Sequence, residues 1–149
     1  LENNISYGGQ PNGHMMNTSF TPYDSAAVGG NNLAGLLARD KVSLAERQQE
    51  LPDYHVANMN IDVPDAFKDE VLRVAHNRIR QTTDTILSTK DGIKSRRGDS
   101  EYLVRGSGTE PIIRIYAGSS QAGDQYQLAN DIHNTIVASM RLINDDYDI

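Results

Sequence analysis

The residues best suited to chemistry lie in one short stretch, residues 105–114, which reads Arg-Gly-Ser-Gly-Thr-Glu-Pro-Ile-Ile-Arg. An arginine stands at each end, with glycine and hydroxyl residues between them. One guanidinium group can donate hydrogen bonds to two oxygens of a phosphate, and hydroxyl groups add neutral donors. Glycine lets backbone N–H groups approach an anion closely. The stretch therefore predicts a phosphate-binding loop formed by Arg105, Gly106, Ser107, Gly108, Thr109 and Arg114.

The residues on either side of this loop indicate the two strands of a hairpin. Apolar, β-branched and aromatic side chains dominate residues 102–104 and 112–116. Along the second strand, Ile113 and Ile115 point to one face while Arg114 points to the other. A Walker-type loop is excluded, because it needs a lysine and a helix start. A surface hairpin with solvated arginines is the alternative, and the spacing alone does not decide between the two.

The same stretch resembles the phosphate-binding loop of the α-D-phosphohexomutases, the family of phosphoglucomutase, phosphomannomutase and phosphoglucosamine mutase. The family pattern is Arg-x-Ser-Gly-Thr-Glu-Pro, then two residues and an arginine, and the sequence matches it throughout. In this resemblance Glu110 and Pro111 shape the loop rather than touch the ligand. The residues implied to hold the phosphate that is not transferred are Arg105, Ser107, Gly108, Thr109 and Arg114.

A second stretch, residues 8–14, reads Gly-Gly-Gln-Pro-Asn-Gly-His. On composition alone it is a polar turn, but it resembles the family's sugar-binding loop, Gly-Glu-x-Ser/Asn-Gly-His. The resemblance implies that Gln10, Asn12 and His14 contact the sugar, and that His14 can assist proton movement. Gln10 departs from the family's glutamate, since an amide offers two donors where a carboxylate only accepts. The sugar preference therefore stays open.

Composition limits the classes of function. The chain has 149 residues, 38% of them hydrophobic, which suits one domain with an appendage. Its net charge of −6 argues against a general role at nucleic acids or membrane surfaces. It has no cysteine and no recognisable signal peptide, so a cytoplasmic protein is expected. Its histidines and carboxylates show no metal-ligand spacing.

The first third of the sequence predicts a loop followed by two helices. Residues 1–23 are rich in Asn, Gly and Pro, which favours loop. Asp24 is the predicted N-cap of a helix that continues to about residue 38. Ser43 and Glu46 have the spacing of a capping box that opens a shorter helix. By resemblance, residues 1–54 are a remnant of the family's third, sugar-binding α/β domain and the hinge that follows it.

The remaining residues, 55–149, predict a compact α+β domain. The expected elements are a strand at 56–63, a helix at 65–81, strands near Ile86 and Ile93, the hairpin, and a long helix capped by Ser119 and Ser120. This order suggests an antiparallel sheet covered on one face by two helices. It agrees with the family's fourth domain, a TATA-binding-protein-like fold. Tyr102 and Tyr116 are expected to be packing residues.

Two motifs of a complete enzyme of that family do not occur in the sequence. By resemblance, the reaction moves a phosphoryl group between two hydroxyls of one sugar. It uses a phosphoserine, Mg²⁺ held by an Asp-Gly-Asp-Gly-Asp loop, and a sugar bisphosphate activator. Neither the Thr-x-Ser-His-Asn-Pro serine loop nor the aspartate loop occurs here.

The sequence is therefore expected to be the C-terminal, substrate-phosphate-binding part of a hexose or hexosamine phosphate mutase. Its expected partners are the substrate and the remaining domains of the same enzyme, and the part alone should not turn over. It should hold no catalytic residue, metal or cofactor of its own. A free-standing, non-catalytic sugar-phosphate-binding or regulatory module stays open. A nucleic-acid role lacks a broad basic face and paired stacking aromatics.

Overall fold

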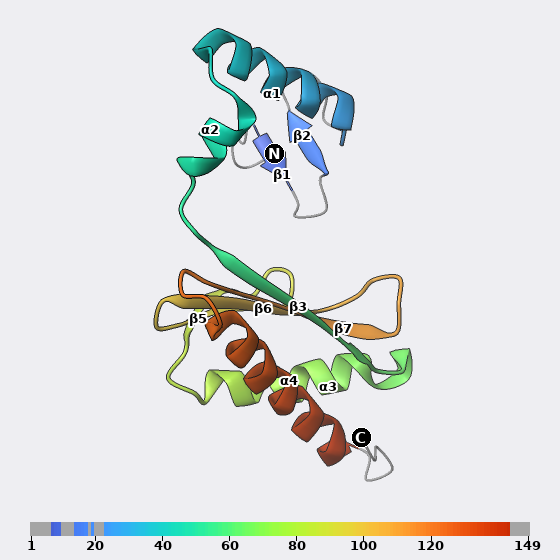
Figure 1. Ribbon diagram of the computed structural model, residues 1–149. Coiled ribbons are helices and arrows are strands. Elements are labelled where there is room, and N and C mark those ends of the chain that lie inside the picture. Colours follow the sequence, from blue (N-terminus) through green and yellow to red (C-terminus); the bar gives the residue numbers. More distant parts are fainter. Residues whose placement is uncertain (1–6, 10–13, 18, 20–22, 144–149) are drawn as a thin grey trace. The chain divides into compact units, whose positions relative to one another are not determined.

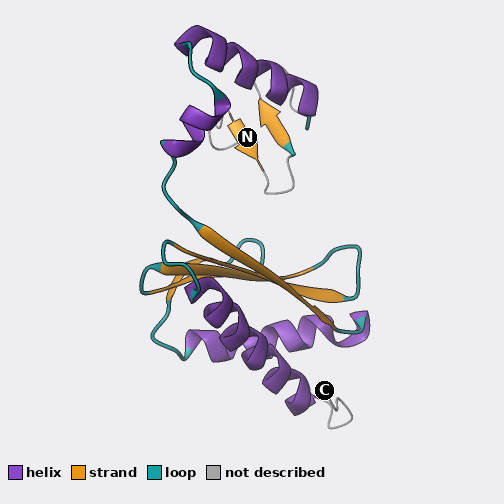
Figure 2. Cartoon of the chain, viewed as in Figure 1, coloured by secondary structure: helices purple, strands orange, loops and turns teal. Residues whose placement is uncertain are grey.

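The computed structural model describes residues 7–9, 14–17, 19 and 23–143 of the chain. Contacts divide the chain into two compact units, Leu1–Leu51 and Pro52–Ile149. Figure 1 labels most elements of each unit, and Figure 2 shows their helices and strands. None of the described helices combines the length and the apolar character needed to cross a membrane.

The first unit contains a small antiparallel ribbon and two helices. The strands are β1 (Tyr7–Gly9) and β2 (Met15–Asn17), and the helices are α1 (Ala26–Asp40) and α2 (Leu44–Gln49). Helix α1 packs closely on β2, since a Cβ added to Gly29 would lie 3.0 Å from the Met15 sulfur. The prediction of loop for residues 1–23 was wrong where β1 and β2 form, because three-residue strands are too short to show a period.

The helix caps of this unit differ in part from the prediction. Ser25, not Asp24, is the N-cap of α1, and its hydroxyl accepts a bond from the Val28 N–H at 3.4 Å. The Asp24 carboxylate instead accepts a hydrogen bond from the Met15 N–H at 3.0 Å, so it contacts β2 rather than the first turn of α1. The predicted capping box of α2 is confirmed, with Ser43 and Glu46 bonding each other's backbone N–H groups.

The second unit is a five-stranded antiparallel sheet with two helices on one face (Figures 1 and 2). The strand order is β3-β7-β6-β5-β4, and both helices pack against the sheet and against each other. The predicted α+β architecture is therefore confirmed. The bounds are β3 (His55–Asp62), α3 (Asp65–Arg80), β4 (Thr85–Ser88), β5 (Ile93–Arg97), β6 (Ser100–Gly106), β7 (Ile112–Ser119) and α4 (Asp124–Ile143).

Alternation along β7 divides the sheet into a core face and an open face. Ile113, Ile115 and Ala117 are buried against the helices, whereas Arg114 and Tyr116 lie on the opposite, half-exposed face. This confirms the predicted faces of the strand. The helices complete the core with residues at helical spacing: Val71, Ala75 and Ile79 from α3, and Leu128, Ala129, Ile132, Ile136 and Met140 from α4.

The predicted start of the last helix was wrong. Strand β7 continues through Ser119, whose hydroxyl accepts a bond from the Gln121 N–H at 3.1 Å. Helix α4 begins at Asp124, directly after Gly123, which has a positive φ of 102°. The serine pair therefore ends a strand and begins a turn, because serine bonds its own backbone equally well in both settings.

A buried carboxylate before β4 is bonded to two strands of the sheet and, through one of them, to a helix. The Asp84 side chain is 2% exposed and accepts two bonds from Arg97, each of 2.9 Å. It also accepts a bond of 2.6 Å from the hydroxyl of Tyr102, so this tyrosine does more than pack. Arg97 in turn donates to Asp131 of α4 at 3.1 Å. Asp84 therefore links the segment before β4 to β5 and β6, and through Arg97 to α4.

Candidate functional site

The loop between β6 and β7 brings together the residues predicted to bind phosphate. Arg105 and Arg114 are directly opposite each other in the antiparallel register. Both side chains belong to the open face, because their strand neighbours Val104 and Ile113 are completely buried. We call the predicted set the phosphate clamp: Arg105, Gly106, Ser107, Gly108, Thr109 and Arg114.

Hydrogen bonds within the loop determine its shape. The Ser107 N–H donates to the Ile112 carbonyl at 3.0 Å and so closes the base of the loop. The Ser107 hydroxyl accepts a bond from the Thr109 N–H at 3.4 Å. Gly108 and Thr109 are exposed, whereas Ser107 is buried. The Gly108 N–H has no hydrogen-bond partner within the described part of the chain, which leaves it available to an anion.

The two glycines of the clamp serve different purposes. A Cβ added to Gly106 would lie 3.1 Å from a methyl group of Leu72, so β6 passes close to α3 at this residue. A Cβ added to Gly108 would meet nothing within 4 Å. Only Gly108 therefore leaves open space around the backbone on the exposed side of the loop.

Each arginine of the clamp has a carboxylate partner. Arg105 donates to Asp91, in the turn between β4 and β5, at 3.1 Å. Arg114 donates through Nη2 to Glu110, which agrees with the expectation that Glu110 shapes the loop. The Nε atom of Arg114 is buried and has no partner among the described residues. The arginines are thus held in place, and one guanidinium donor is still unsatisfied.

Tyr116 is a further member of this surface that sequence reasoning treated only as packing. A hydrogen bond from the Arg114 guanidinium lowers the pKa of the Tyr116 hydroxyl, although partial burial opposes this, and Arg105 adds a second such bond. The Tyr116 hydroxyl is therefore a polar group that faces both arginines of the clamp. The signal was present in the sequence, since Tyr116 lies two residues after Arg114 and so shares its face.

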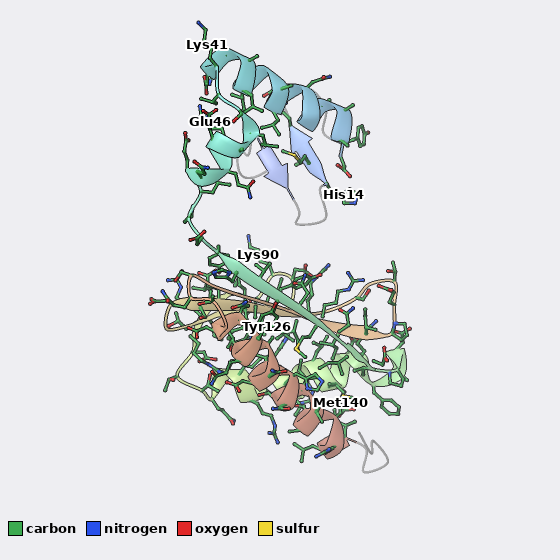
Figure 3. The ribbon with its side chains drawn as sticks, in the orientation of Figure 1. His14, Lys41, Glu46, Lys90, Tyr126 and Met140 are labelled. Carbon is green, nitrogen blue, oxygen red and sulfur yellow. The ribbon has the colours of Figure 1, made fainter. Side chains whose placement is uncertain are left out.

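The predicted sugar-binding residues are described only in part. Gln10 and Asn12 lie outside the described residues. His14 is exposed at the start of β2 (Figure 3), where its Nδ1 atom pairs with the Asp24 carboxylate. An open hollow is lined by this pair and by Gly8, Gly9, Met15 and Met16.

The pairing with Asp24 leaves His14 Nε2 as the ring nitrogen available to a ligand. A carboxylate that accepts from one imidazole nitrogen fixes the tautomer and the orientation of the ring. Sequence reasoning assigned Asp24 to a helix cap and so missed this role. Residues of the capping type are equally able to bond a side chain ten positions away, and the sequence does not say which they do.

We predict that His14→Ala raises the pKa of the Asp24 carboxyl toward the ordinary aspartate value of about 3.9. In the native chain the hydrogen bond from His14 is the main cause that lowers this pKa. The measurement is an NMR pH titration of the Asp24 side-chain carboxyl. A matched control, His133→Ala on α4, should leave the titration unchanged. An unaltered Asp24 pKa in His14→Ala would show that the pair does not form in solution.

The family model of the phosphoglucomutase/phosphomannomutase C-terminal domain matches residues 59–134. A probable phosphoglucosamine mutase of Methanopyrus kandleri is 34% identical over 114 residues, which are 76% of the chain and 25% of that protein. A phosphoglucosamine/phosphogalactosamine mutase of Sulfurisphaera tokodaii is 30% identical over 138 residues, or 91% of the chain and 30% of that protein.

A solved structure shows the same fold. The phosphoglucomutase/phosphomannomutase family protein of Burkholderia thailandensis superposes with a TM-score of 0.72 at 18% sequence identity. The superposition covers 93% of the chain and 29% of that protein. The chain thus spans about a quarter to a third of the length of the proteins it matches.

Proposed function

The chain belongs to the phosphoglucomutase/phosphomannomutase family and carries its C-terminal domain, and on that premise we propose that it holds the substrate phosphate of a phosphohexomutase. The full-length protein would interconvert the 1-phosphate and 6-phosphate of a hexose or hexosamine. The relatives matched are named as mutases of this class, which supports an isomerase. The proposed task of this part is to bind the phosphate group that is not being transferred.

The observation that carries the proposal is the direct pairing of Arg105 and Arg114 across β6 and β7. Two guanidinium groups at the ends of an exposed loop, together with the Gly108 N–H that has no partner among the described residues, match the donors that a phosphate dianion requires. Asp91 and Glu110 occupy these arginines when no anion is bound. A phosphate would compete with these carboxylates for the same guanidinium donors.

The proposed chemistry needs groups that lie outside this chain. Within the described residues there is no group of three or more His, Asp or Glu that could hold a metal ion. We propose that the Mg²⁺ ion, the phosphoserine and the sugar bisphosphate activator belong to the remainder of the full-length protein. Magnesium would offset the charge of the transferring phosphoryl group.

This chain would contribute binding, orientation and the exclusion of water, and would be inactive alone. In the proposed enzyme the phosphate clamp acts on the substrate together with the remaining domains. The His14–Asp24 pair, with Gln10 and Asn12, is proposed to contact the sugar. We also propose a cytoplasmic location, because charged sugar phosphates do not cross a membrane unaided. A free-standing binding module would use the same clamp. Adding the remaining domains of a mutase should restore activity if this chain is part of an enzyme, and should not if it is a free-standing module.

We expect Arg114→Ala to weaken binding of glucosamine 6-phosphate by roughly 10- to 100-fold, since a charged hydrogen bond contributes about 1.5–3 kcal/mol. The measurement is an NMR titration of the full chain, following the amides of Ser107, Gly108 and Thr109. Glucose 1-phosphate should shift the same amides. Weak affinity is expected, because the other domains are absent.

The matched control is Arg96→Ala, which removes the same charge from the open face of the same sheet but lies on β5, paired with Glu101. This control should bind as the native chain does. The proposal would be contradicted if the native chain showed no shift at the loop amides, or if Arg96→Ala weakened binding as much as Arg114→Ala.

A further inference from the structure

A lysine on α3 lies beneath the phosphate clamp. The Lys68 side chain is only 14% exposed. Its ammonium nitrogen is 2.7 Å from the Ser107 carbonyl oxygen and 3.1 Å from that of Glu110, one at each end of the loop. A third contact, of 2.6 Å, joins it to the Asp65 carboxylate. One side chain therefore joins the start of α3 to both ends of the loop that follows β6.

These contacts show that Lys68 is not itself a ligand of the anion. An ammonium group has three N–H donors, and the three acceptors around Lys68 account for all of them. A phosphate could bind Lys68 only by displacing one of these partners. The role that remains is to determine the conformation of the loop.

The direction of the Ser107 carbonyl has a consequence for the next residue. In a trans peptide the C=O and the following N–H point in opposite directions, and the described chain has no cis peptide bond. Because the Ser107 carbonyl points at Lys68, the Gly108 N–H points away from α3, toward the exposed side of the loop. This is the N–H that lacks a partner in the described part of the chain.

The other bonds of the loop join backbone groups, apart from the bonds of the Ser107 hydroxyl and the Glu110 carboxylate described above. The Ser107 N–H bonds the Ile112 carbonyl at 3.0 Å, and the Val63 N–H bonds the Pro111 carbonyl at 2.8 Å. Neither bond determines which way the peptide between Ser107 and Gly108 faces. Lys68 supplies the contact that does.

We propose that Lys68 is a positioning residue of the phosphate clamp, which turns the Ser107 carbonyl toward α3 and so directs the Gly108 N–H at the bound phosphate. The inference rests on the proposed function of the loop and adds the residue that orients it. Sequence reasoning could not find it, because Lys68 and Ser107 are 39 residues apart.

The test replaces Lys68 with methionine, which keeps most of the stem that packs near Gly106 but removes the charge and the three donors. Inorganic phosphate is titrated into the full chain, and affinity is read from the loop amides by NMR. We expect Lys68→Met to weaken phosphate binding about tenfold while the melting temperature changes little. The matched control is Lys94→Met on β5, whose ammonium contacts Glu101 at 2.9 Å on the open face, and it should bind as the native chain does.

A second readout needs no ligand. Hydrogen exchange at Ser107 and the chemical shift of the Gly108 amide should change in Lys68→Met and not in Lys94→Met. If both stay unchanged while the native chain binds phosphate, the inference on Lys68 fails and the proposed function stands. If the native chain binds no phosphate, the proposed function fails, whatever the exchange shows. Equal losses of affinity in the two variants would also overturn the positioning role.

Discussion

Replacing Asp84 with alanine is expected to lower the free energy of unfolding by about 3 kcal/mol or more, since removing one partner of a buried, hydrogen-bonded ion pair typically costs 3–5 kcal/mol. The Asp84 carboxylate is 2% exposed and accepts three bonds, two from Arg97 and one from Tyr102. Alanine removes the acceptor of the Tyr102 hydroxyl and of two donors of the Arg97 guanidinium, which keeps only its bond to Asp131. Urea denaturation of the native and variant chains at pH 7 measures the difference.

The matched control is Asp131→Ala, which removes the other carboxylate partner of the same arginine. The Asp131 side chain is 51% exposed, so its loss should cost less than about 1 kcal/mol. If the two variants were destabilised equally, the burial of Asp84 would not be what makes its ion pair strong.

The effect of Asp84→Ala should depend on pH in one direction. Burial alone would raise the pKa of Asp84, but the bonds from Arg97 and Tyr102 outweigh it and lower the pKa below the ordinary value. A lowered folded-state pKa stabilises the fold fully above the unfolded-state pKa of about 3.9, and this contribution is lost as the pH falls through the folded-state value. The difference between native and variant should therefore be constant from pH 7 to 5 and shrink below about pH 4.

Gly92→Ala is expected to destabilise the second unit by about 3 kcal/mol or more, through backbone strain and overpacking together. Gly92 has a φ of +81°, and a Cβ there would lie 2.1 Å from the Val104 carbonyl oxygen and 2.7 Å from the Arg105 Cβ. Both atoms belong to the central strand β6, which cannot move without breaking the sheet. The variant should also lose phosphate affinity, because the displaced strand carries Arg105. Thermal denaturation and the phosphate titration measure the two effects.

The control for this variant is Gly98→Ala, in the turn between β5 and β6. Gly98 also has a positive φ, of +57°, but a Cβ there would meet nothing within 4 Å. It should cost only about 1–2 kcal/mol, the penalty of the left-handed conformation. If both variants lost the same free energy of unfolding, the close approach of Gly92 to β6 would not contribute to the destabilisation.

Local patterns in the sequence were enough to predict the second unit. Alternation of Ile113, Arg114 and Ile115 gave the strand and both of its faces, because the side-chain period of a strand is fixed by its backbone. The sequence also predicted a hairpin with an arginine at each end of its loop, whereas the direct pairing of Arg105 with Arg114 is seen only in the register of β6 and β7.

The long-range contacts that position the predicted binding residues could not be predicted from local patterns. Lys68, Asp91 and Asp24 each contact a partner distant in sequence, and a lysine or aspartate has no sequence pattern that identifies its partner. The strands β1 and β2 were missed because each has too few residues to show alternation. Sequence reasoning therefore proposed the residues of the clamp and the role of Glu110, but not the contacts of Lys68 and Asp91.

The pairing of Arg105 with Arg114 within interior strands also determines what the clamp can distinguish. Strands β6 and β7 each have a neighbour on both sides, so the spacing of the two guanidinium stems is that of adjacent backbones, about 5 Å between Cα atoms. A phosphate monoester on carbon 1 and one on carbon 6 of a hexose present the same terminal oxygens to such a pair. We therefore expect the clamp to recognise a phosphate group without distinguishing which end of the sugar carries it, and selectivity between sugars to arise outside the β6–β7 loop.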